Sequence, residues 1–281
     1  MAGRRADCGR GEPPAGPAGN RAVVARFRPG FSARLELPFP DLHSPRRGDC
    51  PAGPAFTVAK RFFTLGRMLL LGSLACFIVG YLLGSIPTGY LVARARGVDL
   101  RQVGSGNIGA TNAFRVLGRG PGLVVLAGDA LKGYLACTVG YQSCLRLLEA
   151  CGVAAGASEV ARVMAGLGAV LGHTYTFWLR FRGGKGIATS AGVFAALAPW
   201  ALAVALAGWI LVLACFRYVS LASIAAAVLL PAMVWVMREH AFLCWVTTLV
   251  GVLVIARHHA NLKRLWLGTE PKVQWRGGHR A

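Results

Sequence analysis

Three short segments contain most of the side chains that could do chemistry, and the first covers residues 98–122 (VDLRQVGSGNIGATNAFRVLGRGPG). Its polar and glycine positions are Gly104, Ser105, Gly106, Asn107, Gly109, Thr111, Asn112 and Arg115. Glycines let backbone N–H groups approach an anion, while hydroxyl, amide and guanidinium groups supply further donors. The segment therefore predicts a phosphate-binding loop, with a flexible turn as the alternative interpretation. It does not match G-x-x-x-x-G-K-[ST], so nucleotide binding is not implied.

The second segment, residues 171–192, places Lys185 among Gly183, Gly184 and Gly186 just before a new apolar stretch. A helix that begins after such a turn favours an anion through its free N–H groups and its dipole. Arg182 and Lys185 are the candidate anion ligands. Treating the basic residues only as topology anchors explains their charges but not the glycines. His173 fits a buried neutral histidine equally well.

The third segment, residues 256–272, places His258 and Asn261 three residues apart, on one face of an expected helix. A basic amphipathic tail on anionic lipid is the alternative, and it suits Lys263 and Arg264 better than His258 and Asn261. Outside these segments, Asp129 and Lys132 lie three apart within an apolar stretch. They either neutralise each other or take part in function.

The elements that must position these segments are membrane helices. Of the 281 residues, 55% are hydrophobic and only 15% are charged, which excludes a soluble globular enzyme. Apolar stretches long enough to cross the bilayer follow one another from Met68 to Ala256. The expected spans are residues 68–92, 121–144, 160–179, 187–199, 201–216, 219–236 and 241–256, or five spans if the four short ones after 187 form two longer crossings.

The net charge of +20 is spread in short basic clusters between the apolar stretches, rather than in a nucleic-acid module. Two expected spans separate the first basic segment from the second, and either four or two separate the second from the third. Both numbers are even, so all three basic segments share one face. The positive-inside rule assigns that face to the cytoplasm. No metal-ligand pattern, cofactor motif or paired cysteine motif is present, and we expect activity in the presence of a chelator.

The chain divides into three parts. Residues 1–67 form an Arg, Pro and Gly-rich extension that is predicted to be disordered, residues 68–272 form the multi-span domain, and residues 273–281 form a basic tail. An odd number of spans would leave the extension, with twelve basic and five acidic residues, outside. We therefore hypothesise that translation begins near Met68 or that the extension is lost. Mass spectrometry that found an intact Met1 or Ala2 in the membrane form would contradict this.

The motifs GSGNIGATNAFRVLG, GHTYTFWLRFRGGKG and RHHANLKRLWLGTE, in this order, resemble over residues 68–272 the bacterial acyl-phosphate:glycerol-3-phosphate acyltransferase family, PlsY. The resemblance implies an all-α integral membrane protein with seven transmembrane helices and short polar cytoplasmic loops. It implies transfer of an acyl chain from acyl phosphate to the 1-hydroxyl of glycerol 3-phosphate, giving lysophosphatidic acid and phosphate in the bacterial inner membrane. The family's functional positions match Ser105, Asn107, Arg115, Gly183, Gly184, Lys185, His258, Asn261 and Glu270.

The expected catalytic residues are Ser105, Arg115, Lys185, His258 and Asn261. The expected substrate-binding residues are Gly104, Gly106, Asn107, Thr111, Asn112, Arg182, Gly183, Gly184 and Glu270. Arg115 and Lys185 would clamp phosphate, and no acyl-enzyme is expected. The expected partners are acyl phosphate, glycerol 3-phosphate and membrane lipids, with a separate enzyme supplying acyl phosphate. The main alternative is a transporter of a phosphorylated small molecule; a purely structural helical protein leaves the polar segments unexplained.

Overall fold

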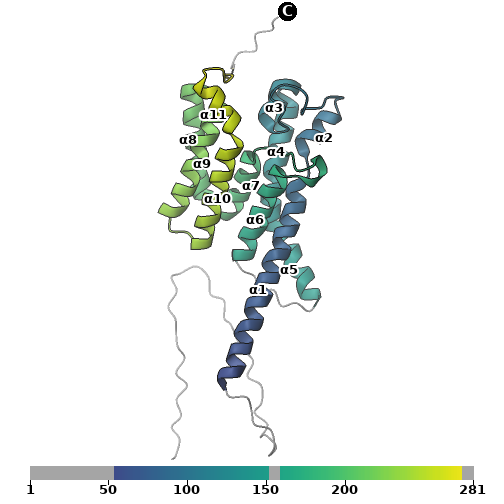
Figure 1. The fold of residues 1–281 in the computed structure, drawn as a ribbon, viewed down its shortest axis with the longest axis vertical. Helices are drawn as coiled ribbons and strands as arrows, with labels where there is room; N and C mark the ends of the chain where they lie inside the picture. Colours follow the sequence, from purple (N-terminus) through teal and green to yellow (C-terminus); the bar gives the residue numbers. More distant parts are fainter. Residues whose placement is uncertain (1–53, 152–158, 274–281) are drawn as a thin grey trace, which may run out of the picture. The chain divides into compact units, whose positions relative to one another are not determined.

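The computed structural model describes residues 54–151 and 159–273, and these contain helices and no strand. Figure 1 shows the helices packed side by side along one direction. The helices before the gap are α1 Pro54–Ser85, α2 Thr88–Arg94, α3 Ala110–Leu117, α4 Arg119–Leu135, a π-helical turn Ala136–Gly140 and α5 Tyr141–Ala150. Those after it are α6 Glu159–Thr174, a 3-10 turn Phe177–Leu179, α7 Ile187–Leu197, α8 Pro199–Phe216, α9 Val219–Val236, α10 Ala241–Arg257 and α11 His259–Trp266.

Helices occupy the positions of all seven expected spans, but not all are long enough to cross a bilayer unaided. Within the described ranges, four segments have the necessary length and apolar composition: Gly66–Arg94, Arg119–Ala150, Pro199–Phe216 and Val219–Val236. The pair α10 and α11, bent by 55°, adds a fifth only if the two helices form one span. Since α6 has 16 residues and α7 only 11, the number of seven crossings remains a prediction.

One predicted boundary is wrong. Helix α1 begins at Pro54, so residues 54–67, which composition assigned to a disordered extension, are helical. The helix formed by the apolar stretch from Met68 continues toward the N-terminus through residues 54–67, PAFTVAKRFFTLGR. Nothing in this segment stops it, because its one proline is at the first helical position and a helix tolerates the other residues. Residues 1–53 and 274–281 lie outside the described residues.

Glycines bring α1 and α6 into backbone contact. A Cβ added at Gly80 or Gly84 would lie 2.0 or 2.1 Å from the carbonyl oxygen of Ala165 or Ala169. From the other side, a Cβ at Gly168 or Gly172 would lie 2.2 Å from a carbonyl oxygen of α1. Small residues four apart allow helices to associate closely where lipid removes the usual hydrophobic driving force. The same device joins α4 to α7 through Gly133 and Gly192.

An arginine holds the opposite end of α6. Arg162 donates through Nε to the carbonyl of Cys137 at 3.1 Å and through Nη2 to the carbonyl of Ala196 at 2.8 Å. Cys137 belongs to the π-helical turn and Ala196 to the last turn of α7, where backbone carbonyls lack helical partners. Arg162 therefore ties α4, α6 and α7 together away from the polar segments.

The packing brings the three polar segments to one end of the bundle. Figure 1 shows α2, α3 and α11 at this end, with α5 at the other. The loop of residues 175–186 lies here too, because Lys185 contacts Asn261 of α11. The three polar segments therefore lie at the same end of the bundle, as expected, although they are far apart in sequence.

Candidate functional site

A chain of hydrogen bonds joins the second polar segment to the third. Lys185 Nζ donates to Asn261 Oδ1, and Asn261 Nδ2 donates to Glu270 Oε1 at 2.6 Å. The other oxygen of Glu270 accepts from Arg264 Nε at 2.7 Å. Asn261 lies on α11 and is 7% exposed, so its two amide atoms hold the ammonium and the carboxylate in fixed positions. Arg264, which the sequence favours as a lipid anchor, belongs to this chain.

The electrostatics of Lys185 follow from its surroundings. Burial lowers its pKa to about 8, and the positive charges of Arg264, Arg257 and Arg115 act in the same direction. Glu270 opposes them but lies behind Asn261. Burial raises the pKa of Glu270, but hydrogen bonds from Asn261 and Arg264 and the positive charge of Arg264 outweigh this effect, so its pKa is lowered. The site thus gathers four cations around one carboxylate, and an added anion would relieve their repulsion.

Arg257 is the residue that sequence reasoning missed. Its Nη2 lies 3.4 and 3.5 Å from the carbonyl oxygens of Gly183 and Gly184, and its guanidinium lies 5.6 Å from the ring centre of Tyr175. Its Nε is buried without a hydrogen-bond partner among the described residues. Its position at the end of a predicted span is typical of a topology anchor, and no local pattern distinguishes it from one.

His258 lies in the break between α10 and α11 and is 3% exposed. Its Nδ1 is 2.8 Å from the carbonyl oxygen of Val254, and a carbonyl can only accept, so Nδ1 carries the proton. Burial and the charge of Lys185 lower its pKa to about 4. His258 is therefore neutral at physiological pH, with the lone pair of Nε2 free to accept a hydrogen bond.

The first segment is organised differently from the expectation. The N–H groups of Gly106 and Gly109 donate to Val103 O and to Asn107 Oδ1, and that of Ser105 donates to Asn112 Oδ1. These N–H groups are used within the loop and do not face an anion. The side chains of Ser105, Thr111 and Arg115 are exposed and could contact phosphate.

Asn112 supports the loop from a buried position, and its expected role in substrate binding stays a prediction. Its side chain is 1% exposed and donates to the carbonyls of Leu100 and Val103 at 3.2 and 3.0 Å. Gly104 has φ +64 and Gly106 has φ +69, so both glycines permit the left-handed turns of this loop. Asn107 accepts from Gly109 across the next turn. Arg115 is near enough to Lys185 for its charge to lower the pKa of that lysine.

The backbone of Gly183 and Gly184 likewise faces inward. Their N–H groups donate to Thr174 O and His173 O at 3.0 and 3.1 Å, and the expected role of both glycines in substrate binding stays a prediction. A Cβ at Gly183 would lie 2.0 Å from His173 O, and one at Gly184 would lie 2.2 Å from His173 Nε2. These positions are glycine because the loop packs directly on the end of α6.

The donors left at this loop are the first turn of α7 and the side chain of Arg182. Gly186 (φ +87) is the N-cap of α7 and no side chain caps the helix. The first N–H groups of a helix lack partners within it, so they are available to an anion beside Lys185. Arg182 is exposed at the same loop. Three buried hydroxyl groups near this turn, those of Thr174, Thr189 and Ser190, have no hydrogen-bond partner within the described residues.

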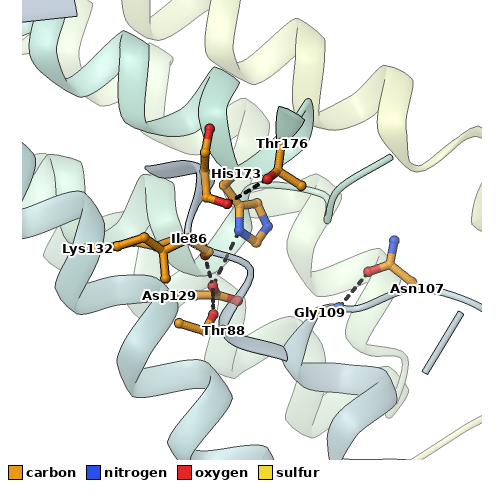
Figure 2. A network of polar contacts seen from close by, with 9 residues as sticks. Ile86, Thr88, Asn107, Gly109, Asp129, Lys132, His173 and Thr176 are labelled. Carbon is orange, nitrogen blue, oxygen red and sulfur yellow. Dashed lines mark hydrogen bonds and ion pairs between the residues drawn. The ribbon is translucent and has the colours of Figure 1, made fainter. Parts of the chain in front are cut away.

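A second buried polar cluster lies beneath the loop (Figure 2). Asp129 Oδ1 is 2.8 Å from Lys132 Nζ, 3.4 Å from His173 Nδ1, and accepts a hydrogen bond from Thr88. Lys132 also donates to the carbonyl of Ile86 at 2.7 Å, in the break between α1 and α2. Asp129 and Lys132 therefore pair, as their spacing suggested, and His173 joins them. Among the described residues, no group of three or more His, Cys, Asp or Glu side chains could hold a metal ion.

The fold and the site together define a helical membrane protein with a cluster of cations at one end of its bundle. The glycerol-3-phosphate acyltransferase family model matches residues 74–268, and the chain belongs to this family. It is accordingly an integral membrane acyltransferase. It is 44% identical over 194 residues to the glycerol-3-phosphate acyltransferase of Trichlorobacter lovleyi, covering 69% of this chain and 94% of that one. It is 43% identical to that of Geobacter sulfurreducens, covering 73% and 100%.

Two solved structures are similar to this chain, and both are crystal structures of PlsY (YgiH), an integral membrane glycerol 3-phosphate acyltransferase. The glycerol 3-phosphate form has a TM-score of 0.63 and 38% identity, and covers 72% of this chain and 96% of that one. The lysophosphatidic acid form has a TM-score of 0.61 and 36% identity, and covers 72% and 95%.

Proposed function

We propose that this protein transfers an acyl group from acyl phosphate to the 1-hydroxyl of sn-glycerol 3-phosphate, releasing phosphate and lysophosphatidic acid in the first step of phospholipid synthesis. The observation that carries the proposal is the group of cations, Lys185, Arg115, Arg257 and Arg264, around one carboxylate at the end of a membrane bundle. Both substrates carry phosphate, and one also carries a long apolar chain. A separate enzyme supplies the acyl phosphate.

Lys185, Arg115 and Arg257 supply the positive charge for the two phosphates. Lys185 acts as a point charge, while the guanidinium of Arg115 can bind phosphate through two parallel hydrogen bonds. Arg257 contributes its Nε, which has no hydrogen-bond partner among the residues that the structure describes. Glu270 does not contact phosphate, because both of its oxygens accept hydrogen bonds from Asn261 and Arg264. Glu270 and Asn261 instead position Lys185.

The reaction needs few groups beyond these. The hydroxyl oxygen of glycerol 3-phosphate attacks the carbonyl carbon of acyl phosphate, and the bond from that carbon to the phosphate oxygen breaks. Phosphate leaves with the electron pair. N–H groups at the first turn of α7 and the side-chain donors stabilise the oxyanion, each contributing roughly 10²-fold in rate. Ser105, exposed on the first loop, orients substrate and is not acylated.

The hydroxyl proton goes to a substrate phosphate rather than to His258. With a pKa of about 4, the ring of His258 is a weak base. A phosphate with a second pKa near ~6 is the stronger base by roughly 100-fold. Nε2 of His258 accepts a hydrogen bond from substrate, which orients the nucleophile.

The acyl chain binds in a groove between α4 and α7. This groove has a volume of about 720 Å³ and an almost wholly apolar lining. It is lined by Val124, Ala127, Gly128, Ala130, Leu131, Tyr134, Ala191, Gly192 and Ala195. On the α4 side of the groove, Gly128 packs beside Thr88 of the polar cluster. On the α7 side, the helix begins next to Lys185, so both sides lead from the groove to the polar end. The polar end faces the cytoplasm of a bacterial inner membrane, where the basic segments favour that side.

The test is product formation from radiolabelled glycerol 3-phosphate by the full-length chain in washed membranes, with acyl phosphate, acyl-CoA or acyl carrier protein as sole donor. We expect labelled lysophosphatidic acid from acyl phosphate alone, with activity lost in Lys185→Ala and retained with a chelator. Product only from a thioester would reject the donor. Uptake of label without lipid product would support the transporter alternative.

A further inference from the structure

The buried cluster beneath the site connects three helices that are distant in sequence. Thr88 comes from α2, Asp129 and Lys132 from α4, and His173 from the last turn of α6. Asp129, Lys132 and His173 are 2%, 6% and 5% exposed. Figure 2 shows the carboxylate of Asp129 between Thr88, Lys132 and the ring of His173. Burying charged groups in a membrane bundle costs free energy, and even a paired cluster is seldom more stable than apolar residues of the same size. Such a cluster is therefore a candidate for a functional role.

The cluster also contacts the loop that carries Lys185. The carbonyl of His173 accepts from Gly184 N–H at 3.1 Å. The ring of His173 occupies the space that a side chain at position 184 would need, because a Cβ there would lie 2.2 Å from Nε2. Thr176, in the same connection, donates to the carbonyl of Ser85 at 2.6 Å, beside the Ile86 carbonyl that binds Lys132. Gly184 therefore packs on the His173 ring, whose Nδ1 faces Asp129, while Gly183 packs on the carbonyl of His173.

The Asp129 and His173 pair has the components of an acid-base dyad, but its geometry is wrong for that role. The distance of 3.4 Å between Nδ1 and Oδ1 is longer than a good hydrogen bond, and the contact is electrostatic. Nε2, the nitrogen that would take a substrate proton, is against Gly184. Substrate cannot reach a ring that the loop covers.

We infer that Asp129, Lys132 and His173 are positioning residues, which fix the Gly183–Gly184 turn and thereby the place of the Lys185 ammonium in the anion site. Asp129 orients the ring of His173. Lys132 pairs with Asp129 and donates to the carbonyl of Ile86, and so fixes Asp129 relative to the break between α1 and α2. The ring of His173 supports Gly184, and Lys185 follows directly. The inference rests on the proposed function of Lys185 as a phosphate ligand.

The test compares Asp129→Asn and His173→Gln with Arg162→Gln as the matched control. Arg162→Gln also removes a charged group from the membrane bundle and untethers α6 from its neighbours, but at the end of α6 away from the loop. All three variants should lower the thermal midpoint in detergent. Only Asp129→Asn and His173→Gln should raise KM for a phosphate-bearing substrate, by about tenfold, because a misplaced ligand weakens positioning. The effect on kcat should be smaller.

Two further readouts separate positioning from a merely structural role. A loosened loop exposes Lys185 to water, which raises the pKa of its ammonium. The pH above which kcat/KM falls should therefore be higher in Asp129→Asn and unchanged in Arg162→Gln. Stabilisation of the purified protein by glycerol 3-phosphate against heat should weaken in the same variants. This binding signal does not depend on turnover, so it remains informative if the proposed acyl donor is wrong.

A steric variant keeps the inference testable if the charge variants do not fold. Gly184→Ala places a methyl group against the ring of His173, and should raise KM in the same way. The double variant Gly184→Ala with His173→Ala should fall short of the sum of the single effects, because both changes act on one contact. Unchanged KM, binding and pH profile in every variant that folds would overturn the inference. A loss confined to kcat, with binding intact, would show a proton-transfer role instead.

Discussion

At the scale of single residues, the decisive fact is that Lys185 has a neutral partner. Its ammonium contacts the amide oxygen of Asn261, and the carboxylate of Glu270 lies one hydrogen bond further away. A lysine paired directly with a carboxylate would have its charge compensated before substrate arrived. Here the amide fixes the ammonium without neutralising it, so the charge remains available to phosphate.

Lys185 gives the first prediction. Its pKa of about 8 means that the free enzyme loses this positive charge as pH rises through that value. We expect kcat/KM for the phosphate substrates to fall above pH of about 8, since that ratio reports the free enzyme. In Lys185→Arg the limb should disappear from this range, because a guanidinium stays protonated. Lys185→Ala should lose on the order of 10²–10³-fold, since truncating a buried charge partner costs about 2–5 kcal/mol.

The measurement is initial rate against pH at limiting substrate, corrected for the donor's own alkaline hydrolysis. If kcat/KM of Lys185→Arg fell over the same pH range as that of the unaltered protein, the fall would belong to a group other than Lys185.

Glu270 gives a prediction of opposite sign. Its negative charge raises the pKa of Lys185, so Glu270→Gln should move the alkaline limb to lower pH and increase KM. Glu239→Gln is the control, because Glu239 is exposed in the turn between α9 and α10. The pH profiles of both variants should be recorded together. A limb that moves upward in Glu270→Gln would contradict the assignment of the limb to Lys185.

At the scale of the elements, backbone contact through glycine decides how the helices fit. Gly84 gives a prediction about the α1 and α6 interface. Gly84→Ala adds a methyl group 2.1 Å from the carbonyl oxygen of Ala169, and overpacking of this kind costs about 1–3 kcal/mol. Gly66→Ala, with open space around position 66, should leave stability unchanged or slightly raised. The check is the thermal midpoint of both variants in the same detergent, and equal midpoints would show that the helices can separate without loss.

The groove between α4 and α7 gives a prediction about acyl chain length. Ala195→Phe fills part of the groove, so KM for long acyl phosphates should rise while KM for glycerol 3-phosphate stays within about twofold, as expected for a change confined to an apolar subsite. Ala207→Phe, on the exposed face of α8, is the control. Rates with acyl phosphates of several lengths should show the change in preference. An unchanged preference would place the chain elsewhere.

At the scale of the whole molecule, all three polar segments lie at one end, and the far end carries the turn with Arg238. Single cysteines at Arg119 and Arg238, in a chain whose native cysteines are replaced, should react differently with a membrane-impermeant maleimide. We expect Arg238→Cys to be labelled in intact cells and Arg119→Cys only after permeabilisation, because basic segments remain in the cytoplasm. The reverse pattern would invert the topology.

The sequence by itself determined the membrane class, the helix positions, the three polar segments and the family. These follow from local properties: apolar length, glycine with donor side chains, and motif order. The site candidates were predicted in the same way. The start of α1 at Pro54 was not, because low hydropathy in residues 54–67 does not prevent helix propagation from the apolar stretch.

Only the tertiary structure decided which groups meet. Lys185 and Asn261 are 76 positions apart, and Asp129 and His173 come from different helices. Whether a glycine N–H faces a ligand or the protein depends on what packs behind it, so Gly183 and Gly184 could not be assigned from their motif. The same holds for Arg257, whose charge can be read from the sequence but whose Nε is buried by tertiary packing and has no hydrogen-bond partner in the described part of the chain. Helix rotation and approach distance are set by contacts between distant residues, and no local pattern encodes them.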